Sequence, residues 1–150
     1  MLKEGDAAPE VQLETASGEM FRLSDLRGRR VVLYFYPKAD TPGCTVEACE
    51  FRDHLADFER KGAAVAGISP DKPVAQARFR DKYELPFPLL ADSEKIAAQA
   101  YGVWKEKNMY GRKVMGIERT TFVIGSDGRI EKIWSKVKAA GHAGQVLAAL

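Results

Sequence analysis

The sequence predicts an α/β fold in which a central mixed β-sheet is flanked by helices. Apolar, β-rich runs alternate along the chain with segments whose apolar residues recur at helical spacing. The alternation ends in a hairpin pattern and a last short helix. This order of elements predicts an α/β sandwich with both parallel and antiparallel pairing. No internal repeat or low-complexity linker interrupts the pattern, so we expect residues 1–150 to form a single domain.

The N-terminal third predicts a hairpin, a helical turn and a buried strand. Residues 9–24 alternate apolar and polar positions around the turn Ala16–Gly18, which is typical of a β-hairpin. Residues 24–28 predict a short helical turn that is closed by glycine. The run VVLYFYP, residues 31–37, is continuously apolar, as expected of a strand that is buried on both faces of a sheet.

The remaining elements follow from the same patterns of spacing and turn residues. We expect a helix from Cys44 to Lys61, a strand over 63–69, a helix over 73–84 and a strand over 87–90. A helix that Asp92 caps should then run to Tyr101, followed by a hairpin of 119–124 and 129–134 and a last helix over 141–150.

Composition and charge exclude several classes of protein. The chain of 150 residues is 45% hydrophobic and 29% charged, close to globular averages, and its net charge of +2 is too small to predict nucleic-acid binding. No stretch has the length of a membrane helix, and MLKEGDAAPEVQ contains no signal-peptide core. We therefore expect a cytoplasmic location without membrane attachment.

The only two cysteines lie in one short stretch, PKADTPGCTVEAC, residues 37–49. In a reducing compartment, paired cysteines favour catalysis, redox sensing or metal binding over a permanent disulfide. A zinc site built from Cys44, Cys49, His54 and His142 has unsuitable spacing. We expect neither a metal nor another bound cofactor.

Cys44 is expected in the first turn of a helix, because Pro42 and Gly43 follow a strand and Thr41 is placed to cap the helix. The unpaired N–H groups and the dipole at such a position stabilise an anion, so cysteines there react as thiolates. At about 100° per residue, Cys44 points along the buried stripe of the helix, whereas Cys49 lies at about 140° from it.

The same geometry separates the two cysteines. Their Cα atoms would lie roughly 8.6 Å apart in an intact helix, whereas a disulfide needs about 7 Å or less. A disulfide between Cys44 and Cys49 would therefore require local unwinding of the helix. From this we derive the hypothesis of a two-state redox switch.

The segment YFYPKADTPGCTVEACEFRD closely resembles the active-site segment of the peroxiredoxins, in particular the bacterioferritin-comigratory or Q-type subfamily. The family signature Pro-x-x-x-Thr-x-x-Cys is met by Pro37, Thr41 and Cys44, and Cys49 matches the second cysteine of the Q-type form. The resemblance continues through SPDKP, LPFPLLAD, AYGVW, RTTFVI and GHA, and so covers nearly the whole chain.

This resemblance implies a thioredoxin-like fold and a thiol peroxidase for hydrogen peroxide and organic hydroperoxides. It implies that Cys44 is the peroxidatic cysteine, that Thr41 hydrogen-bonds the peroxide and that Pro37 shields the thiolate from water. The distant active-site arginine of the family maps onto Arg119. Cys49 would be the resolving cysteine, which forms an intramolecular disulfide with Cys44.

Regeneration of two thiols requires a dithiol reductant. The resemblance implies thioredoxin, with glutaredoxin as the alternative. Since both cysteines belong to one chain, no partner subunit is needed, and we expect a monomer.

Three other functions compete with the peroxidase interpretation. A thiol–disulfide oxidoreductase of the thioredoxin type would use Cys-x-x-Cys, which is absent here. A non-enzymatic peroxide sensor would use the same cysteine chemistry. A cysteine hydrolase would need Cys44 beside His54 or His142, two residues that we expect at the surface or at helix caps. We also expect Glu47 on the helix surface.

Overall fold

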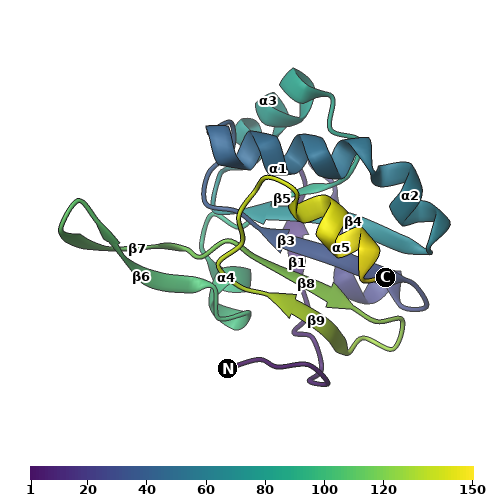
Figure 1. The fold of residues 1–150 in the computed structure, drawn as a ribbon. Helices are drawn as coiled ribbons and strands as arrows, with labels where there is room; N and C mark the ends of the chain where they lie inside the picture. Colours follow the sequence, from purple (N-terminus) through teal and green to yellow (C-terminus); the bar gives the residue numbers. More distant parts are fainter.

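The computed structural model describes residues 1–150 and has a five-stranded sheet at its centre (Figure 1). The strand order is β5-β4-β3-β8-β9, in which β3, β4 and β5 are parallel, and β8 is antiparallel to both β3 and β9. The strands are β3 (Arg30–Phe35), β4 (Ala63–Ser69), β5 (Leu89–Ala91), β8 (Thr120–Ile124) and β9 (Ile130–Trp134). The predicted mixed sheet is confirmed.

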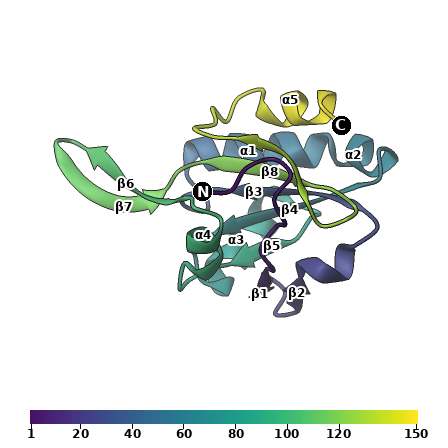
Figure 2. The ribbon, with the colours of Figure 1, turned by 90° about the horizontal axis from the view of Figure 1, so that it is seen from below.

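Helices cover both faces of this sheet. They are the 3-10 helix η1 (Leu23–Leu26), α1 (Pro42–Asp53), α2 (Leu55–Arg60), α3 (Pro73–Tyr83), α4 (Ile96–Ala100) and α5 (His142–Ala148). Figure 2 shows α1, α2 and α5 over one face, with α4 and the N-terminal hairpin on the other. None of these helices has the length and apolar character needed to cross a bilayer. The helix predicted from Cys44 to Lys61 is divided at His54 into α1 and α2.

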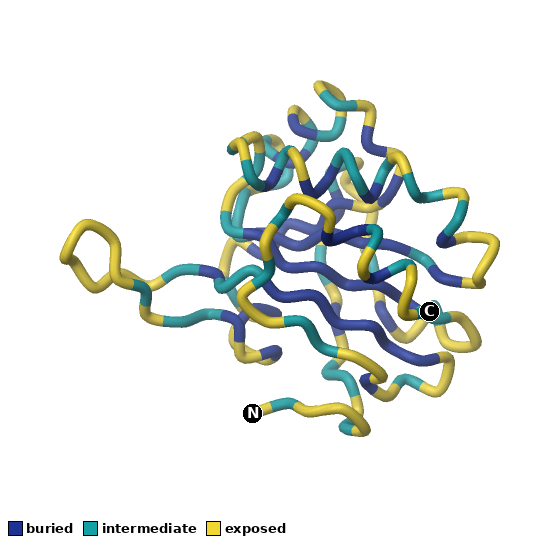
Figure 3. Tube along the Cα trace, in the orientation of Figure 1, coloured by how far each residue is buried: buried dark blue, intermediate teal, exposed yellow.

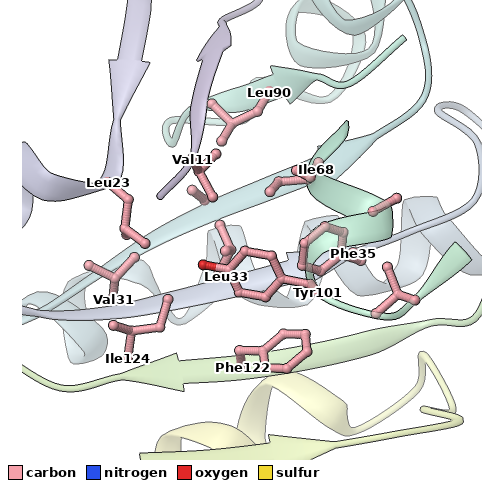
Figure 4. Close-up of a cluster of buried hydrophobic side chains, with 14 of the residues drawn as sticks. Val11, Leu23, Val31, Leu33, Phe35, Ile68, Leu90, Tyr101, Phe122 and Ile124 are labelled. Carbon is pink, nitrogen blue, oxygen red and sulfur yellow. The ribbon is translucent and has the colours of Figure 1, made fainter. Parts of the chain in front are cut away.

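Strand β3 is buried on both faces, as its continuous apolar sequence predicts. Successive side chains of a strand point to opposite faces. Tyr34 therefore packs with Phe51 under α1, while Leu33 and Phe35 enter a second cluster with Phe122 on the opposite face (Figure 4). The central strands are accordingly the most continuously buried part of the chain (Figure 3).

Two antiparallel hairpins lie outside the central sheet. The predicted N-terminal hairpin is present as β1 (Gln12–Glu14) and β2 (Met20–Arg22). A second hairpin, β6 (Trp104–Met109) and β7 (Arg112–Ile117), is not among the predicted elements. It projects from the body as an arm whose tip is exposed (Figures 1 and 3).

The arm hairpin escapes sequence reasoning because most of it has no buried face. Only Ile117, at its base, is fully buried, while Met109, Val114 and Met115 are exposed. Its turn is made by Tyr110 and Gly111, both with positive φ, at 53° and 79°. A tyrosine in this conformation is uncommon and gives no turn signal of the Asn-Gly kind.

A buried polar network fixes the connection between β3 and α1. Tyr36 donates a hydrogen bond of 2.5 Å to the amide oxygen of Gln76, and the Gln76 amide nitrogen donates to Ser69 Oγ at 2.9 Å. Ser69 Oγ donates to the Asp71 carboxylate at 2.6 Å, and that carboxylate accepts the backbone N–H of Ala39 at 2.7 Å. Since buried polar groups are costly when unpaired, this chain of bonds holds the segment just before α1 in place.

Candidate active site

The sheet topology brings Arg119 to the start of α1. In the antiparallel β3–β8 pair, Phe35 at the end of β3 lies opposite Thr120 at the beginning of β8. The residue before β8 and the chain that leaves β3 therefore meet at the same edge of the sheet. Residues 75 positions apart in the sequence, Cys44 and Arg119, become neighbours there.

Cys44 lies in the first turn of α1, as the sequence predicts, and its residue is only 1% exposed. Thr41 occupies the N-cap position with extended backbone, and Pro42 begins the helix. The predicted capping bond is wrong, however. The Thr41 hydroxyl makes no bond to the helix and instead donates to the carbonyl of Lys38 at 2.8 Å. The first-turn N–H groups beside Cys44 are thus not used by this side chain.

The Arg119 guanidinium joins Cys44 to Glu47. Its Nη2 donates to Cys44 Sγ at 3.3 Å, and its Nη1 donates to Glu47 Oε1 at 2.7 Å. Gly43 permits this approach, since a Cβ at that position would lie 3.2 Å from Nη2. Burial lowers the pKa of Arg119, but the charges of Glu47 and Cys44 outweigh burial and raise it overall. The guanidinium therefore stays positively charged beside the sulfur.

Glu47 is fully buried, and its predicted place on the helix surface is wrong. Burial raises its pKa to about 7, although the charge and hydrogen bond of Arg119 act in the opposite direction. Its second oxygen, Oε2, has no hydrogen-bond partner. A signal for this burial exists in the sequence, because Glu47 follows Cys44 by three residues and so shares its stripe of the helix.

Cys49 lies in the same helix as Cys44 and is half-buried. Both cysteines are free thiols. α1 is continuous from Pro42 to Asp53, so the two thiols occupy different sides of one intact helix. The next residue, Glu50, ties α1 to the start of α5, because its carboxylate accepts the N–H of Gly141 at 2.8 Å.

Pro37 is half-buried and lines a pocket of about 460 Å³ between the sheet edge and the arm. The base of the arm contributes Trp104 and Ile117, and the arm itself contributes Lys107 and Met115. A pocket of this volume can hold a small organic molecule.

The histidines do not support a hydrolytic site. His142 is buried rather than exposed, and its ring nitrogens lie 2.7 Å from Thr121 Oγ1 and 3.3 Å from Gln145 Oε1. Burial lowers its pKa, and so does the charge of Arg119. His54 lies 3.7 Å from Asp57. Neither ring bonds to Cys44, and no cluster of three or more His, Cys, Asp or Glu side chains is arranged to hold a metal.

The raised pKa of Glu47 makes the stability of the protein depend on pH in a defined direction. Between pH 4.5 and 7, the carboxyl group is ionised in the unfolded chain but protonated in the folded protein. The folded state then binds more protons, so this residue's contribution to stability falls as pH rises through that window. Glu47→Gln removes the titration and retains an acceptor for Arg119.

We therefore compare the free energies of unfolding of Glu47→Gln and the unmodified protein. The value for Glu47→Gln minus that for the unmodified protein should rise by about 3 kcal/mol between pH 4 and pH 8. Urea denaturation of both proteins at the two pH values measures this difference. Glu59→Gln, at an exposed position of α2, is the matched control and should leave the difference constant. A constant difference for Glu47→Gln as well would show that Glu47 does not titrate in this way.

Comparison with known proteins places this site in a family. Residues 4–133 match the AhpC/TSA family. Among curated relatives, the "Putative peroxiredoxin bcp" of Coxiella burnetii is 49% identical over 146 residues, covering 97% of each chain. The "Peroxiredoxin Bcp" of Bacillus subtilis is 47% identical, covering 97% of this chain and 93% of the relative.

Solved structures agree with the sequence comparison. A cysteine-to-serine variant of Xylella fastidiosa PrxQ superimposes with a TM-score of 0.95 and 40% identity, covering 99% of this chain and 95% of that one. The bacterioferritin comigratory protein of Xanthomonas campestris gives a TM-score of 0.90 with 40% identity, and 96% of each chain is covered. The architecture is thus the thioredoxin-like fold that the resemblance implies. The chain belongs to the AhpC/TSA family and, within it, to the Bcp/PrxQ peroxiredoxins.

Proposed function

We propose that this peroxiredoxin reduces hydrogen peroxide and organic hydroperoxides through a sulfenic acid at Cys44, which Cys49 resolves as an intramolecular disulfide. The observation that carries the proposal is the hydrogen bond of 3.3 Å from Arg119 to the buried Cys44 sulfur, at the N-terminus of α1. The Xanthomonas campestris relative is described in terms of its alkyl peroxide reduction activity, which favours the same substrate class here.

The first step is attack of the Cys44 thiolate on the terminal peroxide oxygen. An S–O bond forms as the O–O bond breaks, and the leaving oxygen departs as hydroxide or alkoxide and takes up a proton. The Arg119 guanidinium and the free first-turn N–H groups of α1 stabilise negative charge at this position. A permanently charged donor serves both the thiolate and the developing oxyanion.

Thr41 and Pro37 complete the proposed site. With its proton donated to Lys38, the Thr41 hydroxyl keeps its lone pairs available to accept a hydrogen bond from the peroxide. Pro37 has no N–H group, is half-buried and lines the pocket. Its proposed role, taken from the family signature, is to shield the thiolate with apolar surface.

The second step is condensation of the sulfenic acid with the Cys49 thiol, which forms the S–S bond and releases water. The intact α1 helix holds the two sulfurs on different sides, so this step requires the helix to unwind between them. A dithiol reductant then attacks the disulfide and restores both thiols through a mixed disulfide.

We propose thioredoxin as this reductant, with glutaredoxin as the alternative. A peroxide turnover assay coupled to each reductant in turn distinguishes them.

Dependence on a reducing thiol pool favours a cytoplasmic location. Since one chain carries both cysteines, we propose that a monomer suffices and that residues 1–150 act as one domain. Both core clusters pack against the same sheet, which supports the last point.

The proposed roles of Cys44 and Cys49 predict different masses after oxidation for the unmodified protein and its two cysteine variants. One equivalent of hydrogen peroxide, followed by alkylation of free thiols, should leave the unmodified protein about two mass units lighter and unalkylated. Cys49→Ser should instead gain one oxygen atom at Cys44, as a sulfenic acid, and Cys44→Ser should stay unoxidised with one alkylated thiol. Intact-mass spectrometry measures all three. Oxidation of Cys44→Ser at the normal rate would contradict the assignment.

Replacement of Arg119 tests the proposed electrostatic stabilisation. Arg119→Gln should lower the second-order rate constant for oxidation by hydrogen peroxide by about 10²–10³-fold, because a donor to the developing oxyanion is lost. Stopped-flow measurement of the single oxidation step gives this constant without a reductant. Arg112→Gln, on the exposed arm, is the matched control and should leave it within twofold. Equal rates for both variants would remove Arg119 from its role.

Unwinding of α1 predicts a local change in hydrogen exchange. In the reduced protein, the amides of residues 45–53 should exchange slowly, and in the disulfide form their exchange should accelerate by at least tenfold. Amides of β3 serve as the internal reference and should keep their protection. Mass-spectrometric exchange on both forms measures this, and unchanged protection of α1 would contradict the two-state switch.

A further inference from the structure

The pocket beside Pro37, here called the arm pocket, combines apolar walls with positive charge. Its lining includes Pro37, Trp104, Met115 and Ile117. Its only charged residues are Lys95 and Lys107, and no acidic side chain lines it. Because Ile117 is followed after one residue by Arg119, the arm pocket lies next to the proposed reaction site.

Lys107 differs from the other lysines of the arm in having no carboxylate partner. Lys105 pairs with Glu118 at 2.6 Å, and Lys113 lies 3.9 Å from Glu106. Lys107 makes no ion pair although its residue is half-buried. Burial lowers the pKa of Lys107, and the nearby charge of Arg119 lowers it further, whereas Glu118 and Cys44 act in the opposite direction. Its ammonium group is thus close enough to the site to feel the charges of Arg119 and Cys44, and it makes no direct ion pair.

The Lys107 side chain packs against the backbone of β7. A Cβ at Gly116 would lie 3.3 Å from Lys107 Cδ, so the stem passes closely over this glycine. The second pocket lysine, Lys95, lies over the ring of Trp104, with its Nζ 5.6 Å from the ring centroid. It too makes no ion pair. Two ammonium groups that make no ion pair therefore flank one apolar surface.

A half-buried ammonium group is stabilised by an anionic partner, and the apolar walls are stabilised by burial of an apolar group. A ligand that satisfies both has an apolar body and a carboxylate. A ligand with its hydroperoxide at Cys44 and its apolar body against Trp104 and Met115 would present a carboxylate at the far end of the body to the lysines.

We propose that the arm pocket is a substrate subsite that selects organic hydroperoxides bearing a carboxylate, with Lys107 as the specificity-determining residue. This inference rests on the proposed peroxidase function and adds to it a charge preference. Lys107 takes no part in bond breaking, because the S–O bond forms and the O–O bond breaks at Cys44. Its effect is therefore confined to substrates with the anionic group.

The test compares two substrates that differ only in charge, cumene hydroperoxide with a para-carboxylate and the methyl ester of the same compound. Single-turnover oxidation of the full chain gives kcat/KM for each. We expect the unmodified protein to prefer the acid by roughly tenfold, the factor that one charge-assisted hydrogen bond provides. The ratio of the two constants cancels any general change in the reactivity of Cys44.

In Lys107→Gln the acid-to-ester ratio should fall towards one, and Lys107→Arg should restore most of it. Lys113→Gln, on the same arm but outside the pocket, is the matched control and should keep the ratio of the unmodified protein. A ratio near one in the unmodified protein, or an unchanged ratio in Lys107→Gln, would overturn the subsite while leaving the peroxidase intact. Lack of reaction with hydrogen peroxide would overturn the proposed function and the subsite together.

Discussion

The antiparallel pairing of β3 with β8 is the constraint on which the site depends. It places the residue that precedes β8 beside the chain that leaves β3, and so brings Arg119 within 3.3 Å of Cys44. The first helical turn around Cys44 provides a helix N-terminus but no side-chain cation. The cysteine alone is a buried thiol at a helix start, and the arginine alone is a cation at a strand end. The sheet makes them a pair.

A charged pair in this position needs structural support, and the protein supplies it from several sides. Glu47, in α1, accepts a hydrogen bond from Nη1 of Arg119, and Gly43 leaves room for Nη2. The network from Tyr36 through Gln76 to Asp71 fixes the segment that enters the helix. Buried Glu47 disfavours its own ionised form, so α1 carries an electrostatic cost for orienting Arg119. Orientation of a reactive group at the expense of stability is common at functional sites.

Much of this arrangement follows from local sequence patterns. The run that forms β3 is apolar on both faces, the segment around Cys44 has helix-start residues, and the Gly125–Gly128 turn marks the β8–β9 hairpin. These features depend on neighbours in the chain, so the sequence predicts them. The pairing of Glu47 with Arg119 and the burial of His142 depend on contacts between distant segments, whereas the Thr41 hydroxyl is diverted from its capping bond by the nearby Lys38 carbonyl. The arm hairpin is not predictable for a different reason, since it has no core-facing side over most of its length and so leaves no hydrophobic pattern. Arg119 could be singled out only through family resemblance, because nothing in its own segment distinguishes it from other arginines.

The unequal burial of the two cysteines gives the redox cycle a direction. Cys44 is 1% exposed at the base of the site, whereas Cys49 is half-buried on another side of the same helix. A peroxide of a few atoms can reach a sulfur that the surface of another protein cannot touch. In the proposed cycle, the peroxide would therefore react at Cys44, whereas the reductant would approach the Cys44–Cys49 disulfide from the side of Cys49. The two reactants would be separated by molecular size, because only the smaller one reaches the buried sulfur.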